Sequence, residues 1–164
     1  MKRLPVLIGL LLLIGLGAWW FSPTQKMKRR VSNMIQTANV PANMPDIARN
    51  TRGPNLEKYL ARKIRIQPPS GFPERIPHQL KRENAALFYS AAARGVRMIS
   101  LQAPSFDAVE IEGDQATVRF QVDAIVDLGA TRPVDGIMHI NSRWRRDSEE
   151  GWRLESLAWE ESGR

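Results

Sequence analysis

Hydrophobic and polar residues alternate over residues 116–128, which is the two-residue period of a β-strand with one buried face. The apolar members of this run are Ala116, Val118, Phe120, Val122, Ala124, Val126 and Leu128. Over residues 134–146 the apolar residues Val134, Met138, Ile140 and Trp144 again fall on even-numbered positions. A turn at residues 129–133 joins the two runs. The pattern therefore predicts two adjacent antiparallel strands whose even-numbered side chains face a core.

Two further strands are predicted on either side of this pair. Residues 97–111 have a strand pattern that is interrupted at Pro104, and Gly113 and Asp114 provide the next turn. The last strand spans residues 152–160, where the apolar phase shifts between Leu154 and Leu157 and so predicts a β-bulge. Four antiparallel strands with one polar face need a cover on the other face, and we expect the preceding helices to supply it.

The first of these helices is predicted over residues 26–39, where apolar residues recur at helical spacing. Its apolar residues are Met27, Val31, Met34, Ile35 and Ala38. Pro41 and Pro45 end the helix, and residues 39–53 form a polar connector.

A second helix is predicted from Pro54, because proline suits the first turn of a helix. Its inward stripe is Leu56, Tyr59, Leu60 and Ile64, and residues 63–67 then alternate as a short strand. Four prolines in residues 68–78 exclude regular structure there. A third helix is expected over residues 80–94, with a packed side of Leu80, Leu87, Phe88, Ala91 and Ala92.

An uncharged apolar segment runs from Leu4 to Phe21, with Lys2 and Arg3 before it and a basic cluster after it. Eighteen residues make a helix about 27 Å long, close to the thickness of a bilayer core. The segment therefore predicts a single-pass membrane anchor with Trp19 and Trp20 at the interface. A cleaved signal peptide and a buried globular helix are the alternatives. We expect a cytoplasmic N-terminus and an extracytoplasmic domain, although the basic residues at 26–30 oppose that orientation.

The charge of the chain is divided along its length. There are 24 Lys and Arg residues against 17 Asp and Glu residues among 164, and no Cys. Residues 1–30 carry +6, residues 31–97 carry +7 and residues 98–164 carry −6. The absence of Cys excludes disulfides, thiolate zinc sites and a cysteine nucleophile. The basic run at 26–30 has no aromatic residues interleaved with it for base stacking, so it predicts contact with lipid phosphates and no nucleic-acid partner.

The order of these elements resembles that of nuclear transport factor 2-like domains, which include the SnoaL-like and ketosteroid isomerase-like proteins. The resemblance is carried by residues 59–66 (YLARKIRI), 82–89 (RENAALFY), 113–118 (GDQATV) and 151–154 (GWRL). It implies an α+β fold of three helices on a curved, mostly antiparallel sheet, a cystatin-like cone, with the N-terminal transmembrane helix added to it. We divide the chain into an anchor at 1–22, a basic helix and connector at 23–53, and the rest of the cone at 54–164, with the fold beginning near residue 26.

In such a cone, the resemblance places a pocket between the sheet and the helices. The candidate pocket residues are Tyr59, Phe88, Tyr89, Met98, Val118, Phe120, Met138, Ile140, Trp144 and Trp159. Ser142 also points inward. No carboxylate falls on the inward phase of the two clearest strands, and an isomerase-like reaction needs one beside a proton donor such as Tyr59 or Tyr89. We therefore expect a non-catalytic domain without cofactor or metal. Its expected partner is a protein, a second copy of the chain through the sheet, or a small apolar ligand. The alternative is a SnoaL-like or isomerase-like enzyme acting on a hydrophobic substrate.

One polar pair stands out on the outer face. If Leu128 pairs with Val134, the register sets Asp123 opposite His139. A carboxylate-held histidine can orient a proton transfer, but a solvated cross-strand pair is the favoured interpretation, because no nucleophile accompanies it.

Overall fold

The computed structural model describes residues 19–69, 77–129 and 132–163 of the chain. Its helices are α2 (Pro23–Thr37), α3 (Asp46–Asn50), α4 (Arg52–Glu57) and α5 (Arg82–Gly95). Its strands are β1 (Leu60–Gln67), β2 (Gln79–Lys81), β3 (Met98–Leu101), β4 (Ser105–Glu112), β5 (Gln115–Asp127), β6 (Val134–Asp147) and β7 (Gly151–Gly163). The predicted α+β class is confirmed, with α3 and α4 taking the place of the second helix.

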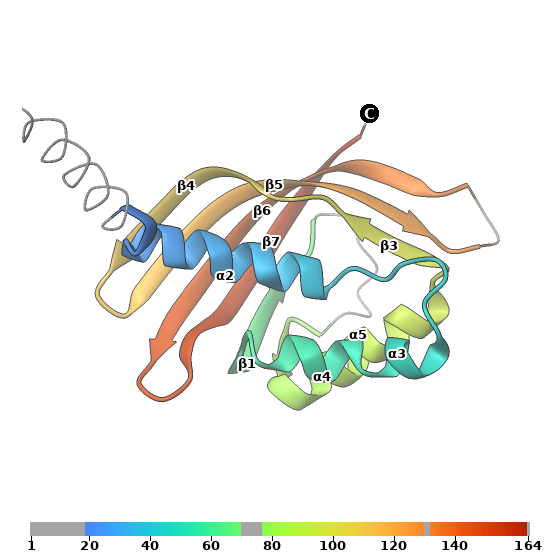
Figure 1. Cartoon of the computed structure of the whole chain (residues 1–164), viewed down its shortest axis with the longest axis horizontal. Helices are drawn as coiled ribbons and strands as arrows, with labels where there is room; N and C mark the ends of the chain where they lie inside the picture. Colours follow the sequence, from blue (N-terminus) through green and yellow to red (C-terminus); the bar gives the residue numbers. More distant parts are fainter. Residues whose placement is uncertain (1–18, 70–76, 130–131, 164) are drawn as a thin grey trace, which may run out of the picture.

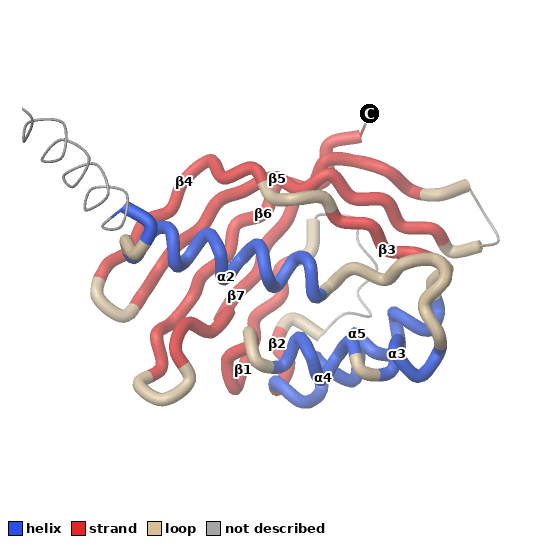
Figure 2. Tube along the Cα trace, in the orientation of Figure 1, coloured by secondary structure: helices blue, strands red, loops and turns tan. Residues whose placement is uncertain are grey.

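The strands form one curved sheet in the order β2-β1-β7-β6-β5-β3, and β4 pairs with β5 beyond the break at Pro104. Every pair of strands is antiparallel except β1 with β7, which is parallel. Helix α2 crosses the concave face of the sheet, while α3, α4 and α5 form a separate group below it (Figures 1 and 2). The sheet and the helices together form the cone.

Helix α2 begins three residues earlier than the apolar pattern predicted. Ser22 is its N-cap and accepts a hydrogen bond from the backbone N–H of Gln25 at 3.3 Å, and Pro23 occupies the first turn. The predicted apolar face is confirmed, because the buried residues of the helix are Met27, Val31, Met34 and Ile35. They pack against the even-numbered side chains of β5, which the alternating pattern placed correctly as far as Ala124.

The second helix is shorter than predicted, and the connector is not wholly irregular. Helix α3 lies within residues 39–53, and α4 ends at Glu57. Leu60 and Ile64, which we expected on the helix, belong to β1. The two residues are four positions apart, and the strand has a register shift between Leu60 and Arg65. A spacing of four places two side chains on one face of a helix and also on one face of a strand, so the apolar pattern was compatible with both structures.

Helix α5 buries a different face from the one predicted. Leu87 is 68% exposed and Phe88 47%, whereas the buried residues are Ala86, Ser90 and Ala93. The reason is a close crossing with α4, where the backbone N–H of Gly53 donates to Ser90 Oγ at 3.1 Å. Small side chains are required on this face, so Leu87 points outward and Phe88 keeps about half of its surface exposed. Leu80, expected on this helix, lies on β2.

No helix in the described part of the chain is long and apolar enough to cross a membrane. Most of the predicted membrane segment, residues 4–18 of 4–21, lies outside the described residues, as do residues 70–76 of the proline-rich loop. The end of the membrane segment is described: Trp19, Trp20 and Phe21 are all exposed. The guanidinium of Arg29 lies over the Trp20 ring, 4.7 Å from its centroid.

Candidate functional site

A cavity of about 340 Å³ lies between the concave face of the sheet and helices α2, α4 and α5. Six of its lining residues were predicted from the sequence, and they are Phe88, Tyr89, Phe120, Met138, Ile140 and Trp159. Helix α2 and its C-cap contribute Met34, Ile35 and Ala38, and β1 contributes Leu60, Ile64 and Ile66. The described lining side chains are aliphatic, thioether or aromatic, and their polar groups are the Tyr89 hydroxyl and the Trp159 indole N–H.

The bulge in β7 explains how one strand supplies two neighbouring wall residues. Trp144 pairs with Leu154, whereas Arg143 pairs with Ser156, so Glu155 is the extra residue. Strict alternation would send Leu154 and Leu157 to opposite faces of the sheet. The bulge changes the phase between them, and both leucines line the cavity. The predicted bulge is therefore confirmed, and it enlarges the apolar wall.

Tyr89 carries the one hydroxyl group of the described lining, and this group already has a partner. Its O–H donates to the backbone carbonyl of Ala38, the C-cap residue of α2. Burial raises the pKa of Tyr89 to about 12. The hydroxyl is therefore neutral and engaged in tying α5 to α2.

Tyr59, the other proposed proton donor, is buried outside the cavity. The Arg30 guanidinium lies 4.5 Å from the centroid of its ring, and Lys58 Nζ lies 5.2 Å from it. Its hydroxyl is 3.4 Å from Thr37 Oγ1. These contacts give Tyr59 a structural place between α2 and the sheet.

Three other predicted pocket residues also lie outside the lining. Val118 and Trp144 face the core as predicted, but they are buried beneath other side chains. Met98 is half-buried on β3, opposite Asp127 of β5. Sequence reasoning missed Leu56, Leu60, Ile64, Leu154 and Leu157 as cavity residues. Their apolar stripe was recognised, but it was assigned to the core in general.

Asp123 and His139 are not paired as predicted. The register of β5 and β6 sets His139 opposite Gln121, and Asp123 opposite Ile137. Val134 pairs with Val126, whereas we expected it to pair with Leu128, so the observed register differs from the predicted one by two residues. A shift of two residues leaves every side chain on its predicted face of the sheet. On its other side His139 faces Glu160 of β7. Within the described residues, no group of three His, Asp or Glu side chains is placed to hold a metal ion.

No protein-family model and no curated protein matches the sequence. Solved structures do match the fold. One is a nuclear transport factor 2-like superfamily protein from Salmonella enterica serovar Typhimurium LT2, with 13% identity, a TM-score of 0.56, and coverage of 86% of this chain and 94% of that one. The fold is that of nuclear transport factor 2-like proteins.

Two further structures agree with this assignment. A nuclear transport factor 2-like protein with a cystatin-like fold from Novosphingobium aromaticivorans has 15% identity and a TM-score of 0.51, over 85% of this chain and 89% of that one. A protein described as a candidate ketosteroid isomerase from Parabacteroides distasonis has 11% identity and the same TM-score, over 87% and 89%. At such identities the likeness concerns the fold and carries no activity with it.

Proposed function

We propose that this chain is a non-catalytic, membrane-anchored domain whose cone binds a small, uncharged, apolar ligand. The observation that carries the proposal is the cavity of about 340 Å³, whose described walls are apolar apart from the hydrogen-bonded Tyr89 hydroxyl and the Trp159 indole N–H. Its volume lies in the range of ordinary small-molecule pockets, which begins at about 300 Å³.

The same walls argue against a charged or strongly polar ligand. A polar group that enters an apolar pocket without a hydrogen-bond partner loses about 2–7 kcal/mol of solvation. The Tyr89 hydroxyl cannot donate a hydrogen bond to such a group, because its proton is already donated to the Ala38 carbonyl. A hydrocarbon ring or short chain meets no such cost. A cavity of this volume also fits a small ligand better than it fits a protein surface.

The test uses two probes of the same shape and different charge, cyclohexane and cyclohexylammonium. The full chain is held in uncharged detergent micelles, and methyl NMR signals of Met138, Ile140 and Leu157 are followed during titration. We expect cyclohexane to shift these signals, and the ammonium probe to bind at least about tenfold more weakly. Equal effects of the two probes, or no shift with either, would contradict the proposal.

Two alanines of α5 provide a filling variant and its matched control. Ala85 lines the cavity, whereas Ala91 is exposed on the same helix. We expect Ala85→Phe to abolish the cyclohexane shifts, because the new ring occupies the space, and Ala91→Phe to leave them intact. Loss of binding in both variants would indicate a general disturbance of α5 and no specific cavity site.

Membrane anchoring is supported by the aromatic residues that precede α2. Trp19, Trp20 and Phe21 are exposed side by side, with Arg29 stacked on Trp20 and its Nη2 donating to the Trp20 carbonyl at 2.9 Å. Tryptophan next to a basic residue is typical of the headgroup region of a bilayer. The apolar residues before them supply the spanning segment of the proposal.

Topology is tested by fusing reporters that are active on only one side of the membrane to Arg164. Activity of the extracytoplasmic reporter in the membrane fraction is expected. Cytoplasmic activity would reverse the orientation, and release of the fusion by alkaline washing of the membranes would contradict the anchor itself.

A further inference from the structure

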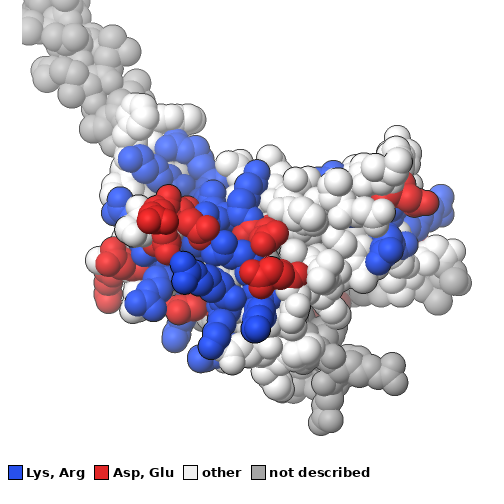
Figure 3. Space-filling model, turned by 90° about the horizontal axis from the view of Figure 1, so that it is seen from below, with Lys and Arg blue, Asp and Glu red and all other residues white. Residues whose placement is uncertain are grey.

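Lys and Arg side chains gather, with Asp and Glu among them, at the end of the molecule that carries the start of α2 and the β6–β7 turn (Figure 3). An open groove of about 870 Å³ lies there. Six basic residues line it, namely Arg62, Lys63, Arg82, Arg145, Arg146 and Arg153, against the three acidic residues Asp114, Asp147 and Glu155. The groove therefore carries a net positive charge, and it is separate from the apolar cavity.

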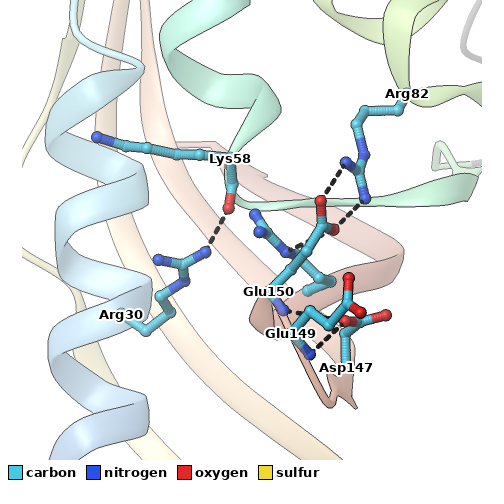
Figure 4. Close-up of polar contacts among 7 residues, drawn as sticks. Arg30, Lys58, Arg82, Asp147, Glu149 and Glu150 are labelled. Carbon is cyan, nitrogen blue, oxygen red and sulfur yellow. Dashed lines mark hydrogen bonds and ion pairs between the residues drawn. The ribbon is translucent and has the colours of Figure 1, made fainter.

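At this end of the molecule one carboxylate, that of Glu150, is shared by two guanidinium groups. Arg82 donates to both of its oxygens, at 3.1 and 2.7 Å (Figure 4). Arg153 Nε lies 3.2 Å from Oε2 of the same group. The side chains of Arg82 and Arg153 are only 15% and 12% exposed, whereas that of Glu150 is 38% exposed. The arginines are thus fixed and the carboxylate is the accessible member.

The β6–β7 turn presents Glu150 to these arginines. Asp147 Oδ1 accepts the backbone N–H groups of Glu149 and Glu150, both at 2.9 Å (Figure 4). These hydrogen bonds hold the pKa of Asp147 below its usual value, and the hydrogen bond from Arg82 does the same for Glu150. The Glu150 side chain is therefore ionised, and the turn holds it beside the two arginines.

Positive charge exceeds negative charge at this point. Arg30 of α2 is partly buried, and its pKa is lowered by that burial and by the like charge of Arg153. Its Nη2 donates to the Lys58 carbonyl, which carries no full charge (Figure 4). Among the described residues, Arg30 Nε, Arg82 Nε and Arg153 Nη1 are buried without a hydrogen-bond partner. Two guanidinium groups thus share the Glu150 carboxylate, a third charges the same region without contacting that carboxylate, and all three retain unused donors.

We propose that the groove at Arg82 and Arg153 binds a phosphate-class oxyanion, which takes the place now held by the Glu150 carboxylate. A guanidinium fork matches two oxygens of phosphate as it matches a carboxylate, and phosphate adds a third oxygen and more negative charge. The third oxygen and the additional charge suit the guanidinium N–H groups that have no hydrogen-bond partner among the described residues. The oxyanion is either free phosphate or the headgroup of a phospholipid, since both present the same chemistry.

The test follows the Nε–Hε NMR signals of Arg82 and Arg153 in the full chain, held in uncharged detergent micelles. One titration uses inorganic phosphate and a second uses short-chain phosphatidic acid, with sodium chloride at matched ionic strength as the blank. We expect saturable shifts with the phosphate compounds and none with chloride. Tighter binding of phosphatidic acid, by about tenfold or more, assigns the site to a lipid headgroup. Equal affinities assign it to phosphate itself.

Glu150→Gln gives the sharpest result, because the proposal predicts a gain. Removal of the competing carboxylate should tighten phosphate binding at least about threefold, which a misfolded variant cannot imitate. Arg153→Gln should weaken binding about tenfold or more. Arg119→Gln is the matched control, since Arg119 pairs with Glu110 at 2.7 Å on an exposed part of the sheet.

Two outcomes would overturn the proposal. Unchanged or weaker phosphate binding in Glu150→Gln would show that the carboxylate does not compete for the site. Equal weakening in Arg119→Gln and Arg153→Gln would show that phosphate follows net charge alone.

Discussion

Arg49 Nη1 donates to the backbone carbonyl of Ala93 at 2.8 Å, although the two residues are 44 positions apart in the chain. The same nitrogen donates to the Val96 carbonyl at 2.6 Å, and Nη2 donates to that of Arg97 at 2.9 Å. Arg49 is only 6% exposed. Its positive charge sits at the C-terminal end of α5, where the unpaired carbonyls carry partial negative charge. One side chain thus joins α3, the end of α5 and the start of β3.

We predict that Arg49→Met lowers the free energy of unfolding by about 3 kcal/mol. Several buried carbonyls would lose their donor, and each unsatisfied buried group costs about 1–3 kcal/mol before the structure relaxes. Urea unfolding followed by circular dichroism measures the change. Arg49→Lys keeps the charge and loses the planar guanidinium, so its free energy of unfolding should lie between those of the parent protein and Arg49→Met. A lysine variant as stable as the parent would contradict this role of the guanidinium.

Gly53 is predicted to be irreplaceable at the α4–α5 crossing. A Cβ atom at this position would lie 1.9 Å from the Ala86 carbonyl oxygen and 2.4 Å from Ser90 Oγ. Gly53→Ala should therefore destabilise the domain by roughly 2 kcal/mol or more, because backbone must move. Gly95 is the control, since a Cβ there meets nothing within 4 Å. Gly95→Ala should be neutral or slightly stabilising in the same thermal unfolding measurement.

Ser142 and Asn141 are adjacent on β6, and a new carboxylate should affect stability strongly at Ser142 and weakly at Asn141. Ser142 is fully buried; its hydroxyl donates to the Val118 carbonyl and accepts from Trp144 Nε1, both at 3.0 Å. Ser142→Asp should cost several kcal/mol because it buries a carboxylate, whereas Asn141→Asp on the exposed face should change stability by about 0.5 kcal/mol or less. Equal losses would show that the two faces of β6 are misassigned.

The Tyr89 hydroxyl predicts a loss of stability at high pH. Its pKa in the folded chain is about 12, above the usual value of 10.0, so folding favours the neutral form. The stabilisation is complete below pH 10 and is lost as the pH rises from 10 to 12. Tyr89→Phe should remove this part of the pH dependence and cost about 1 kcal/mol at neutral pH, through the lost bond to Ala38. Ultraviolet titration of the phenolate gives the pKa, and ionisation of Tyr89 near pH 10 would contradict the buried hydroxyl.

The sheet was largely predictable because its signal is local. Alternation in β5 and β6 depends only on neighbouring residues, and it correctly placed Phe120, Ile140 and Ser142 inward. The register was not predictable to the residue, since it depends on the geometry of the turn, and a shift by two residues leaves the alternation unchanged. For that reason Asp123 was placed opposite the wrong residue while its face of the strand was right.

The buried face of α5 and the contacts of Arg49 and Arg82 were not predictable, because they depend on residues far away in the chain. Ala86 and Ser90 face inward only because Gly53 approaches them from another helix. Burial of Arg49 has no local marker, since arginine is normally exposed and its partners here are backbone carbonyls. Arg82 and Glu150 are 68 positions apart, so neither the groove nor its shared carboxylate had a signature in the sequence.

The parallel pairing of β1 with β7 determines when this domain can be completed during synthesis. Helix α2 and β1 emerge first, but the neighbour of β1 in the middle of the sheet is the last strand of the fold. Contacts between such distant segments form slowly, because a long stretch of chain must be closed first. Until β7 arrives, one edge of β1 stays unpaired and the apolar wall lacks Leu154 and Leu157. An immature chain therefore exposes an unpaired strand edge and apolar surface until β7 has been made, and both favour association with other immature chains.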